Sequence, residues 1–472
     1  MGARSAITAG MCAIASGALF FFSTNLGSIW PLAWLAATPV LWLAYGRARS
    51  WQVLAAAFAA FALGQLTLFE AYGIMAATLA VLLVVTSAAF AAGVLLARLA
   101  YRRLPPAAAI LVFPAYWTAF EFAFTHLSPN GSYGSIAYSQ TFVPVLIQSA
   151  ALVGLGGVTF LICVVANAIA MIAREPRRAL WPAVIAASLV LANVAFGFVR
   201  LDGPAPPRYR VAAAADDRVR FGWTEAQTLG IARSYARLTT QLAAQGAHVV
   251  VFSEKAAEIQ PQWLPVYEVL RQSARVTKTT LIAGFEEHGT EVQNVALVFR
   301  PDGSMLRYVK QRLLLGFENY PAGTTPGIIG DGQAVEICKD MDYPHGVRND
   351  VRGRDINVVF VPALDFSLDV DAHARLAIMR GVEDGFAVVR ASRFGLLTVT
   401  DANGRVIASA ASDTGLVRAI VADVPLGPGH SLYLSIGDSF DWLCVAFTLV
   451  CAGVGMFHRS APRPPLFAYL QT

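Results

Sequence analysis

The first 200 residues consist almost entirely of apolar segments long enough to cross a lipid bilayer. A membrane-spanning helix needs about 20 consecutive apolar residues. Seven such segments follow one another, at residues 7–24, 28–45, 52–70, 73–97, 106–125, 143–172 and 180–199, and an eighth lies at 437–457. No small-residue cleavage site follows the first segment, so we expect a retained helix there and not a signal peptide. The whole chain is 56% hydrophobic and 14% charged, against about 25% charged in soluble domains. The sequence therefore predicts an integral membrane protein.

The arginines near these segments indicate how the chain is oriented. The loops at 46–51, 98–105 and 173–179 carry arginines, whereas those near 25–27, 70–72 and 126–142 carry no lysine or arginine. Loops rich in Lys and Arg face the cytoplasm, which predicts that both termini are cytoplasmic. The predicted organisation is then a seven-helix membrane domain (1–200), an extracytoplasmic domain (203–432), a last membrane helix (437–457) and a cytoplasmic tail (458–472).

The long segment between the last two apolar segments has the pattern of an α/β domain. A Pro-rich linker at 200–210 precedes it. Residues 249–252 and 358–361 are short apolar runs typical of buried strands, and residues 224–245 have apolar side chains at helical spacing. Strands and helices alternate along the segment, which indicates an α/β fold with substantial sheet.

Three residues at the ends of predicted strands are candidates for catalysis. Cys338 is the only cysteine between the two apolar blocks, and its place after a strand exposes backbone N–H groups that lower a thiol pKa and hold an oxyanion. Glu254 ends an apolar strand, where a partly buried carboxylate serves as a general base. Lys310 supplies a fixed cation, with Glu318 eight residues later. Taken singly, each also has a plain interpretation: a buried structural cysteine, a solvated acid, or a surface lysine.

Other kinds of site and partner find little support. The five cysteines have no paired spacing, which gives neither a metal site nor a disulfide framework. The net charge of +5 is small for the length, and the basic residues fall largely in short loops, so nothing favours nucleic acid. No metal or organic cofactor is implied, and nothing demands more than a monomer.

Several motifs extend these observations. The sixth apolar segment is preceded by Gly134-Ser-Ile-Ala-Tyr-Ser-Gln140, and a second motif consists of Lys310, Glu318 and Pro321 at the spacing of a known family signature. A third consists of Ile337-Cys338 followed by Tyr343-Pro344. A fourth runs from Ala372-His373 to Arg380-Gly-Val-Glu383-Asp-Gly385. In these motifs, in helix count and in the position of the inserted domain, the chain resembles the bacterial apolipoprotein N-acyltransferase family. That family carries a nitrilase-superfamily domain between the last two of eight membrane helices.

The resemblance implies a four-layer αββα sandwich on an eight-helix membrane bundle. It also implies a Glu254–Lys310–Cys338 triad, with Glu318 and Asp340 as auxiliary acids. The flanks differ from the family pattern: Ser253 replaces a proline, Leu315-Gly316-Phe317 replaces Pro-Phe-Gly, and Lys339-Asp340 replaces Tyr-Glu after the cysteine.

The implied reaction is a two-step acyl transfer at the outer face of a bacterial inner membrane. Cys338 takes an acyl group from a membrane phospholipid as a thioester. The N-terminal amine of a lipoprotein, on a diacylglyceryl-cysteine, then accepts it. Two alternatives stay open: a membrane-tethered carbon–nitrogen hydrolase or amidase that uses water as acceptor, and a degenerate homologue that binds lipid or lipoprotein without turnover.

Overall fold

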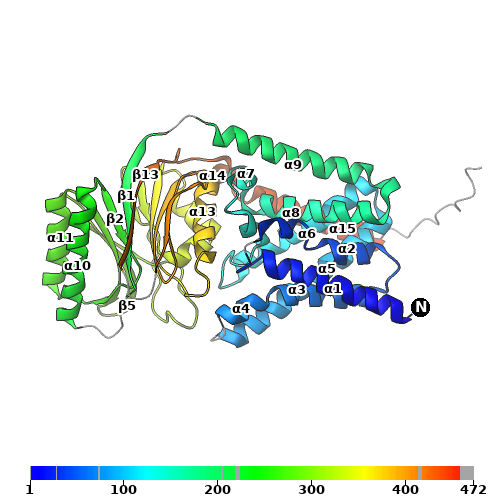
Figure 1. The fold of residues 1–472 in the computed structure, drawn as a ribbon, viewed down its shortest axis with the longest axis horizontal. Coiled ribbons are helices and arrows are strands. Elements are labelled where there is room, and N and C mark those ends of the chain that lie inside the picture. Colours follow the sequence, from blue (N-terminus) through cyan, green and yellow to red (C-terminus); the bar gives the residue numbers. More distant parts are fainter. Residues whose placement is uncertain are drawn as a thin grey trace, which may run out of the picture.

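The structure consists of a helical bundle at one end and an α/β domain at the other (Figure 1). It is a computed structural model that describes residues 2–27, 29–72, 75–203, 206–217, 224–412 and 417–457. The predicted tail, residues 458–472, lies outside the described residues.

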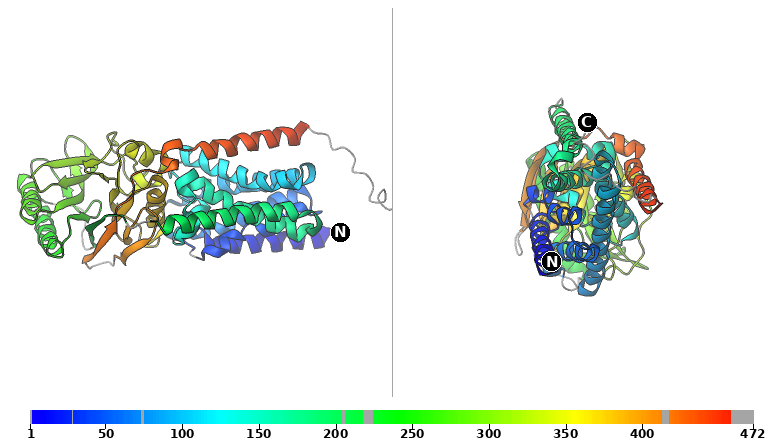
Figure 2. Two further views of the ribbon diagram at one scale, coloured as in Figure 1. Left: turned by 90° about the horizontal axis from the view of Figure 1, so that it is seen from above. Right: turned by 90° about the vertical axis from the view of Figure 1, so that its right-hand side faces the viewer.

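The bundle helices lie side by side along the long axis of the molecule (Figure 2). They are α1 (Gly2–Ser23), α2 (Thr38–Tyr45), α3 (Ser50–Gly64), α4 (Leu66–Ala71), α5 (Ala76–Arg103), α6 (Pro106–Leu127), α7 (Pro144–Ile147), α8 (Ala150–Arg174), α9 (Leu180–Leu201) and α15 (Ser439–Phe457). Within the described residues, six helices are long and apolar enough to cross a membrane. Large apolar side chains point outward from the bundle, among them Ile7, Leu191 and Leu449 at 62%, 68% and 67% exposure. Such a surface is suited to contact with lipid.

The predicted second span is wrong as a single helix. The described part of this segment, residues 29–45, contains a 3-10 turn, η1 (Trp30–Trp34), followed by the eight-residue α2. Pro31 and Pro39 lie in the first turns of η1 and α2, because proline fits a helix start but interrupts a helix interior. Eight residues rise only about 12 Å, against a hydrocarbon core of about 30 Å. The described residues therefore do not supply eight full spans.

The α/β domain contains two sheets. Its strands are β1 (Arg208–Asp216), β2 (Val249–Phe252), β3 (Glu258–Ile259), β4 (Thr280–His288), β5 (Val292–Phe299), β6 (Met305–Val309), β7 (Ile328–Gly330), β8 (Gln333–Val335), β9 (Val358–Leu364), β10 (Ala387–Arg393), β11 (Leu396–Thr400), β12 (Val406–Ala411) and β13 (Val417–Pro425). One sheet has the order β13-β1-β2-β4-β5-β6 with β3 beside β4, and the other has the order β12-β11-β10-β9-β8-β7. The central pairs β1–β2, β2–β4, β8–β9 and β9–β10 are parallel.

The domain has four layers, as the family resemblance implies. Side chains of both sheets, such as Val251 and Phe360, share one buried core between the sheets. Helices α10 (Glu225–Ala244) and α11 (Leu264–Thr277) cover the outer face of the first sheet. Helices α12 (Pro344–Val351) and α13 (Ala372–Asp384) cover that of the second. The order is therefore helix, sheet, sheet, helix.

Helix α13 also joins this domain to the bundle. Leu376, Met379 and Val382 of α13 belong to the buried core of the bundle. Glu383 Oε1 accepts a hydrogen bond of 2.6 Å from the backbone N–H of Leu155, next to a kink in α8. The short helix α14 (Leu432–Ile436) then leads into α15. The same helix thus fixes the second sheet against the end of the bundle.

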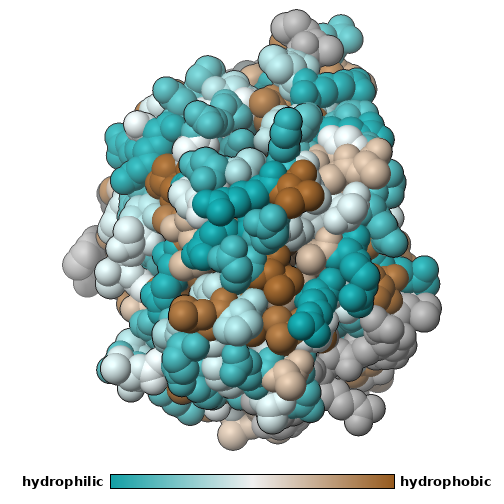
Figure 3. Space-filling model, turned by 90° about the vertical axis from the view of Figure 1, so that its left-hand side faces the viewer, coloured by the Kyte–Doolittle hydropathy of each residue, from teal (hydrophilic) through white to brown (hydrophobic). Residues whose placement is uncertain are grey.

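The opposite end of the α/β domain has a different surface. Seen from that end, the molecule is mostly hydrophilic, with apolar residues scattered between polar ones (Figure 3). Helices α10 and α11 lie there, at the greatest distance from the bundle (Figure 1). The long axis thus runs from a lipid-facing end to a water-facing end.

Candidate active site

The predicted catalytic residues lie where strands of the two sheets end. Glu254 comes two residues after β2, Lys310 directly after β6, and Cys338 three residues after β8. The carboxyl ends of buried strands are where α/β domains place their ligands. All three side chains are buried, with residue exposures of 2%, 3% and 9%. The interpretations of Glu254 and Lys310 as solvated surface groups are therefore wrong.

Lys310 is held between two carboxylates. Its Nζ donates to Glu254 Oε1 at 2.7 Å and to Glu318 Oε2 at 3.0 Å. Burial lowers the pKa of Lys310, but the charges of Glu254 and Glu318 outweigh it and raise the pKa well above its ordinary value. The ammonium therefore stays charged in a site from which water is nearly excluded, where a fixed charge acts most strongly.

Glu318 is ionised for the same reason. Burial raises its pKa, but Lys310 and Lys255 lower it to about 2. Lys255 Nζ lies 3.0 Å from Glu318 Oε1, and the Leu314 N–H donates to Glu318 Oε2 at 2.7 Å. The sequence analysis missed Lys255. It directly follows Glu254, and nothing in the sequence distinguishes it from an ordinary charged loop residue.

Asn294 is a second residue that the sequence analysis missed. Its Nδ2 donates to Glu254 Oε1 at 2.6 Å and to Glu318 Oε1 at 2.7 Å. The side chain is fully buried in β5. The available signal was an amide directly before the apolar run Val295–Phe299 of the same strand, since a polar group that is buried requires partners.

The hydrogen bonds that the Glu254 carboxylate accepts from Asn294 and Lys310 both end on Oε1. Within the described part of the chain, Oε2 accepts no hydrogen bond, and it is not among the fully enclosed polar atoms. One oxygen is thus occupied in holding the site together. The other has free lone pairs with which to accept a proton.

Cys338 begins the 3-10 helix η5 (Cys338–Asp342) with φ of 39°. This left-handed conformation is unfavourable for a residue with a Cβ, and such strain is concentrated at functional sites. Its Sγ lies 3.7 Å from the carbonyl oxygen of Leu364 and 4.0 Å from Asp365 Oδ1. Cys338 thus lies after a strand and at a helix start, as the sequence predicts, and the first N–H groups of a helix lack intrahelical partners.

The predicted direction of the Cys338 pKa is wrong. Burial, followed by the charges of Glu254 and Asp365, raises the pKa of the thiol well above its ordinary value, and Lys310 and Arg390 only partly oppose this. The sequence placed the thiol at a helix start but did not reveal that two carboxylates face it. A neutral thiol at rest requires a base at the moment of attack.

Asp340 holds together the chain segments on which Lys310 and Cys338 lie. Oδ1 accepts hydrogen bonds from the N–H groups of Gln311 and Arg312, at 3.1 and 2.7 Å. Oδ2 accepts from the Ile337 N–H at 2.9 Å and from the Tyr308 hydroxyl at 2.8 Å. Burial raises the pKa of Asp340 to about 7, against the opposing effects of Lys310 and these donors. Its geometry is that of a positioning residue.

A buried ion pair lies beneath the thiol. Arg390 donates two hydrogen bonds to the carboxylate of Asp365, and the Ser392 hydroxyl donates a third at 2.6 Å. Burial raises the pKa of Asp365, but Arg390 lowers it below its ordinary value. These residues were missed because β9 and β10 become neighbours only in the folded sheet.

A large apolar cavity lies beside this site. It encloses about 1060 Å³, including its open mouth. Its walls come from α3 to α6 and include Leu79, Leu83 and Phe120. Lys339 and Leu314 also line it, whereas Glu254, Lys310 and Cys338 do not. The cavity therefore reaches the neighbours of the catalytic candidates from the direction of the bundle.

The loop between α6 and α7 forms part of this cavity. Asn130, Tyr133 and Ser135 line it. Ser132 donates through its N–H and its hydroxyl to the carbonyl oxygen of Asp342, at 2.8 and 2.7 Å. The uncharged loop of the membrane domain is thus bonded directly to η5, which begins with Cys338.

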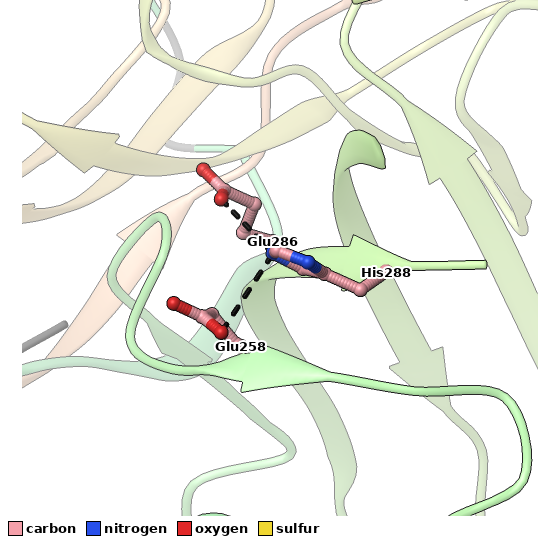
Figure 4. Close-up of side chains that lie close together, drawn as sticks. All are labelled: Glu258, Glu286 and His288. Carbon is pink, nitrogen blue, oxygen red and sulfur yellow. Dashed lines mark hydrogen bonds and ion pairs between the residues drawn. The ribbon is translucent and has the colours of Figure 1, made fainter. Parts of the chain in front are cut away.

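Three residues of metal-binding type gather beside the site. Glu258 of β3 and Glu286 and His288 of β4 place their donor atoms within 4.8 Å of one another (Figure 4). His288 Nε2 lies 3.1 Å from Glu286 Oε1, and Lys255 Nζ lies 3.3 Å from Glu286 Oε2. These contacts account for the arrangement, and we assign the cluster no metal.

The chain is similar in sequence to proteins named apolipoprotein N-acyltransferase. The sequence model of the apolipoprotein N-acyltransferase N-terminal domain matches residues 16–169. A protein named apolipoprotein N-acyltransferase from Geobacter metallireducens is 28% identical over 95% of this chain and 96% of its own length. A protein of the same name from Caulobacter vibrioides is 26% identical over 83% of each chain.

Solved structures similar to the chain cover about half of it. An amidase from Nesterenkonia sp. AN1 is 18% identical, covering 50% of this chain and 98% of its own, with a TM-score of 0.41. The nitrilase-superfamily member Nit3 from Saccharomyces cerevisiae is 17% identical, covering 46% and 90% respectively, with a TM-score of 0.39.

Proposed function

We propose that this chain is a member of the apolipoprotein N-acyltransferase family, whose sequence model and curated proteins it matches, and that it acylates lipoproteins. An acyl group passes from a membrane phospholipid to a thioester on Cys338 and then to the N-terminal amine of a lipoprotein. Glu254, Lys310 and Cys338 carry the chemistry. Glu318 and Asp340 are auxiliary: Glu318 holds Lys310, and Asp340 holds the two chain segments together.

One observation carries this proposal. A buried cysteine, a buried carboxylate and a buried ammonium act on one another electrostatically, and they lie beside an apolar cavity walled by membrane helices. Acyl chains are apolar, whereas the ester to be attacked is polar. A cavity with apolar walls and a polar end matches such a donor.

In the first step, Glu254 accepts the proton of the Cys338 thiol. The thiolate attacks the ester carbonyl carbon, a C–S bond forms, and the carbonyl electrons move onto oxygen. Lys310 and the N–H groups at the start of η5 stabilise that oxyanion. The C–O bond then breaks, and lysophospholipid leaves with the proton that Glu254 returns.

In the second step, the lipoprotein amine attacks the thioester carbonyl. A C–N bond forms, Glu254 takes the proton of the attacking amine, and the C–S bond breaks. The thiolate is then protonated, and the N-acylated product leaves. Because Lys310 stays positively charged between two carboxylates, it is available to stabilise the oxyanion of both steps.

We propose that this happens at the outer face of a bacterial inner membrane. The support comes from the loop arginines and from the arrangement of the ends: α1 begins and α15 ends far from the α/β domain (Figure 2). Both termini would then face the cytoplasm and the α/β domain the periplasm. A monomer suffices, since every proposed residue comes from one chain.

The test is intact-mass analysis of the purified protein and of Cys338→Ser after incubation with phospholipid. Half of each sample also receives a diacylglyceryl-cysteine peptide. We expect a hydroxylamine-sensitive acyl mass on Cys338, absent from Cys338→Ser, that disappears as the peptide gains an acyl group.

Two other outcomes would support the alternatives. Acylation that clears without the peptide, with release of fatty acid, would indicate a hydrolase. No acyl mass in folded protein, with several phospholipids offered, would reject the proposed reaction with these donors and favour a non-catalytic binding role.

A further inference from the structure

Lys339 is a buried lysine that the proposed mechanism does not use. The chain has only four lysines. Lys255 and Lys310 are ion-paired with Glu318, and Lys278 is exposed at the end of α11. Lys339 directly follows Cys338, is 6% exposed, and lines the apolar cavity.

The ammonium of Lys339 lacks a close partner. Within the described part of the chain no acceptor lies within hydrogen-bonding distance of its Nζ. Asp342 Oδ2 is 3.6 Å away, and the centre of the Tyr343 ring is 6.0 Å away. An ammonium that is largely withdrawn from water is unfavourable unless it is closely paired and hydrogen-bonded. The position therefore calls for an anionic group delivered through the cavity.

A second cation lines the same end of the cavity. His373 Nδ1 lies 3.4 Å from Asp342 Oδ1, and its Nε2 lies 3.5 Å from Asp369 Oδ2. Burial lowers the pKa of His373, but Asp342 and Asp369 outweigh it and raise the pKa to about 9. The side chain is thus an imidazolium at neutral pH.

Asp342 does not satisfy these two cations. Its two carboxylate oxygens are enclosed and take part in no hydrogen bond among the described residues. Both of its ion-pair contacts, at 3.6 and 3.4 Å, are longer than a charged hydrogen bond of about 2.7–2.9 Å. Lys339 and His373 therefore keep donor capacity for a ligand between them.

The remaining walls limit what that ligand is. The lining from the membrane helices is mainly apolar and includes Leu68, Leu79, Leu82, Leu83 and Phe120, with Glu121 as its one acid among the described residues. An anion joined to alkyl chains fits both ends. A fatty acid carboxylate meets that description but carries no ester for Cys338 to attack, whereas a glycerophospholipid carries both an ester and a phosphodiester.

We propose that Lys339 and His373 bind the phosphodiester of the phospholipid donor and so select phosphate-bearing lipids over neutral glycerolipids. This rests on the proposed function and deepens it, because it assigns the headgroup end of the donor. The phosphate lies beside Lys339, and the neighbouring acyl ester then lies beside Cys338, one residue away.

The test compares two donors with identical acyl chains, phosphatidylglycerol and diacylglycerol, on full-length protein in detergent. The readout is kcat/KM for thioester formation on Cys338. A hydrogen bond to a charged group contributes about 1.5–3 kcal/mol, which corresponds to roughly 10- to 100-fold. We expect the wild type to favour phosphatidylglycerol by that factor. Lys339→Met should lose the preference because its KM for phosphatidylglycerol rises while kcat stays nearly unchanged.

Two further variants act as controls. Lys339→Arg retains the positive charge and should keep most of the preference for phosphatidylglycerol, although a guanidinium group is wider than an ammonium group. Lys278→Met removes the exposed lysine and should behave as the wild type. A preference for phosphatidylglycerol that survives Lys339→Met would overturn the proposal. An equal loss of kcat/KM with both donors would also overturn it, because Lys339 would then act on Cys338 itself.

Binding to Cys338→Ser separates this proposal from the reaction. Phosphatidylglycerol should bind this variant more tightly than diacylglycerol, and adding Lys339→Met should remove the difference even if no thioester ever forms. Inorganic phosphate at the same concentration lacks alkyl chains and should not displace the lipid. Displacement by inorganic phosphate, or binding indifferent to Lys339, would contradict a lipid phosphate site.

Discussion

Asn294 shows how much of this site depends on single side chains. One amide group donates to both Glu254 and Glu318, which keeps two carboxylates at hydrogen-bonding distance around Lys310. The amide is neutral and adds no third charge.

Replacing Asn294 with aspartate should therefore disable the site. A third carboxylate between Glu254 and Glu318 replaces two favourable hydrogen bonds with repulsion in a buried environment. We expect kcat for thioester formation to fall at least about 100-fold, comparable to the loss of one preorganised donor. Gln293→Glu is the control, because the neighbouring side chain bonds to Arg307 instead. Similar losses in both variants would contradict a specific role for Asn294.

The raised pKa of Cys338 makes a prediction about its reactivity with pH. Because the folded-state pKa lies above the ordinary value of 9.0, the thiol is protonated at neutral pH. Its thiolate forms only as the pH rises beyond that value. The rate of alkylation by a small neutral reagent should increase with pH and show no plateau below pH 9.

Lys310→Met tests the electrostatic part of this argument. Lys310 lowers the thiol pKa, so its removal should shift the alkylation profile to still higher pH. Lys278→Met should leave the profile unchanged. A plateau near neutral pH in the wild type would indicate a resting thiolate and contradict the stated electrostatics.

At the scale of elements, the contact between the loop after α6 and η5 determines where the site meets the cavity. Gly131 has φ of +56°, and a Cβ there would lie 2.4 Å from the carbonyl oxygen of Asp342. That oxygen is the acceptor for Ser132. The glycine is thus required both by its conformation and by the close approach of η5.

Gly131→Ala should destabilise this contact and lower activity. The left-handed conformation costs about 1–2 kcal/mol for a residue with a Cβ, and the clash must add to this by displacing η5. Gly316→Ala is the matched control, because Gly316 has φ of +85° and nothing within 4 Å of its Cβ position. The unfolding temperature and the rate of thioester formation should both fall further in Gly131→Ala than in Gly316→Ala. Equal effects would mean that backbone strain alone matters.

At the scale of the whole molecule, the two ends differ in the solvent to which they are suited. The bundle exposes large apolar side chains, and the far end of the α/β domain is mostly hydrophilic (Figure 3). The cavity begins among the membrane helices and ends at Lys339. A lipid can therefore reach the site without passing through water.

The proposed orientation can be checked with a membrane-impermeant maleimide on intact cells. Arg233→Cys, on the exposed face of α10, should be labelled from outside, whereas Arg177→Cys, in the exposed loop before α9, should be labelled only after permeabilisation. Four of the five native cysteines are buried and the fifth partly buried, which keeps the background low. The reverse labelling pattern would overturn the assignment of the outer face.

The membrane class, the α/β class of the inserted domain and the candidate residues Glu254, Lys310, Cys338 and Glu318 could all be predicted from the sequence. They could be predicted because hydrophobic length and periodicity are local properties, and because the family motifs are contiguous. The prediction of a single membrane-spanning helix at residues 28–45 was wrong, because two prolines divide a segment whose composition is continuously apolar.

The electrostatics of the site could not be predicted from the sequence, because they depend on groups that folding brings together. Lys255, Asn294, Asp365 and Arg390 come from separate strands and loops, and no pattern along the chain places them around Lys310 and Cys338. The pKa of a thiol depends on the burial and charges that folding brings to it, which is why its direction was predicted wrongly. Likewise, Lys339 is an ordinary charged residue in the sequence, and only the folded domain places its ammonium at the cavity with no closer partner among the described residues than Asp342 Oδ2 at 3.6 Å.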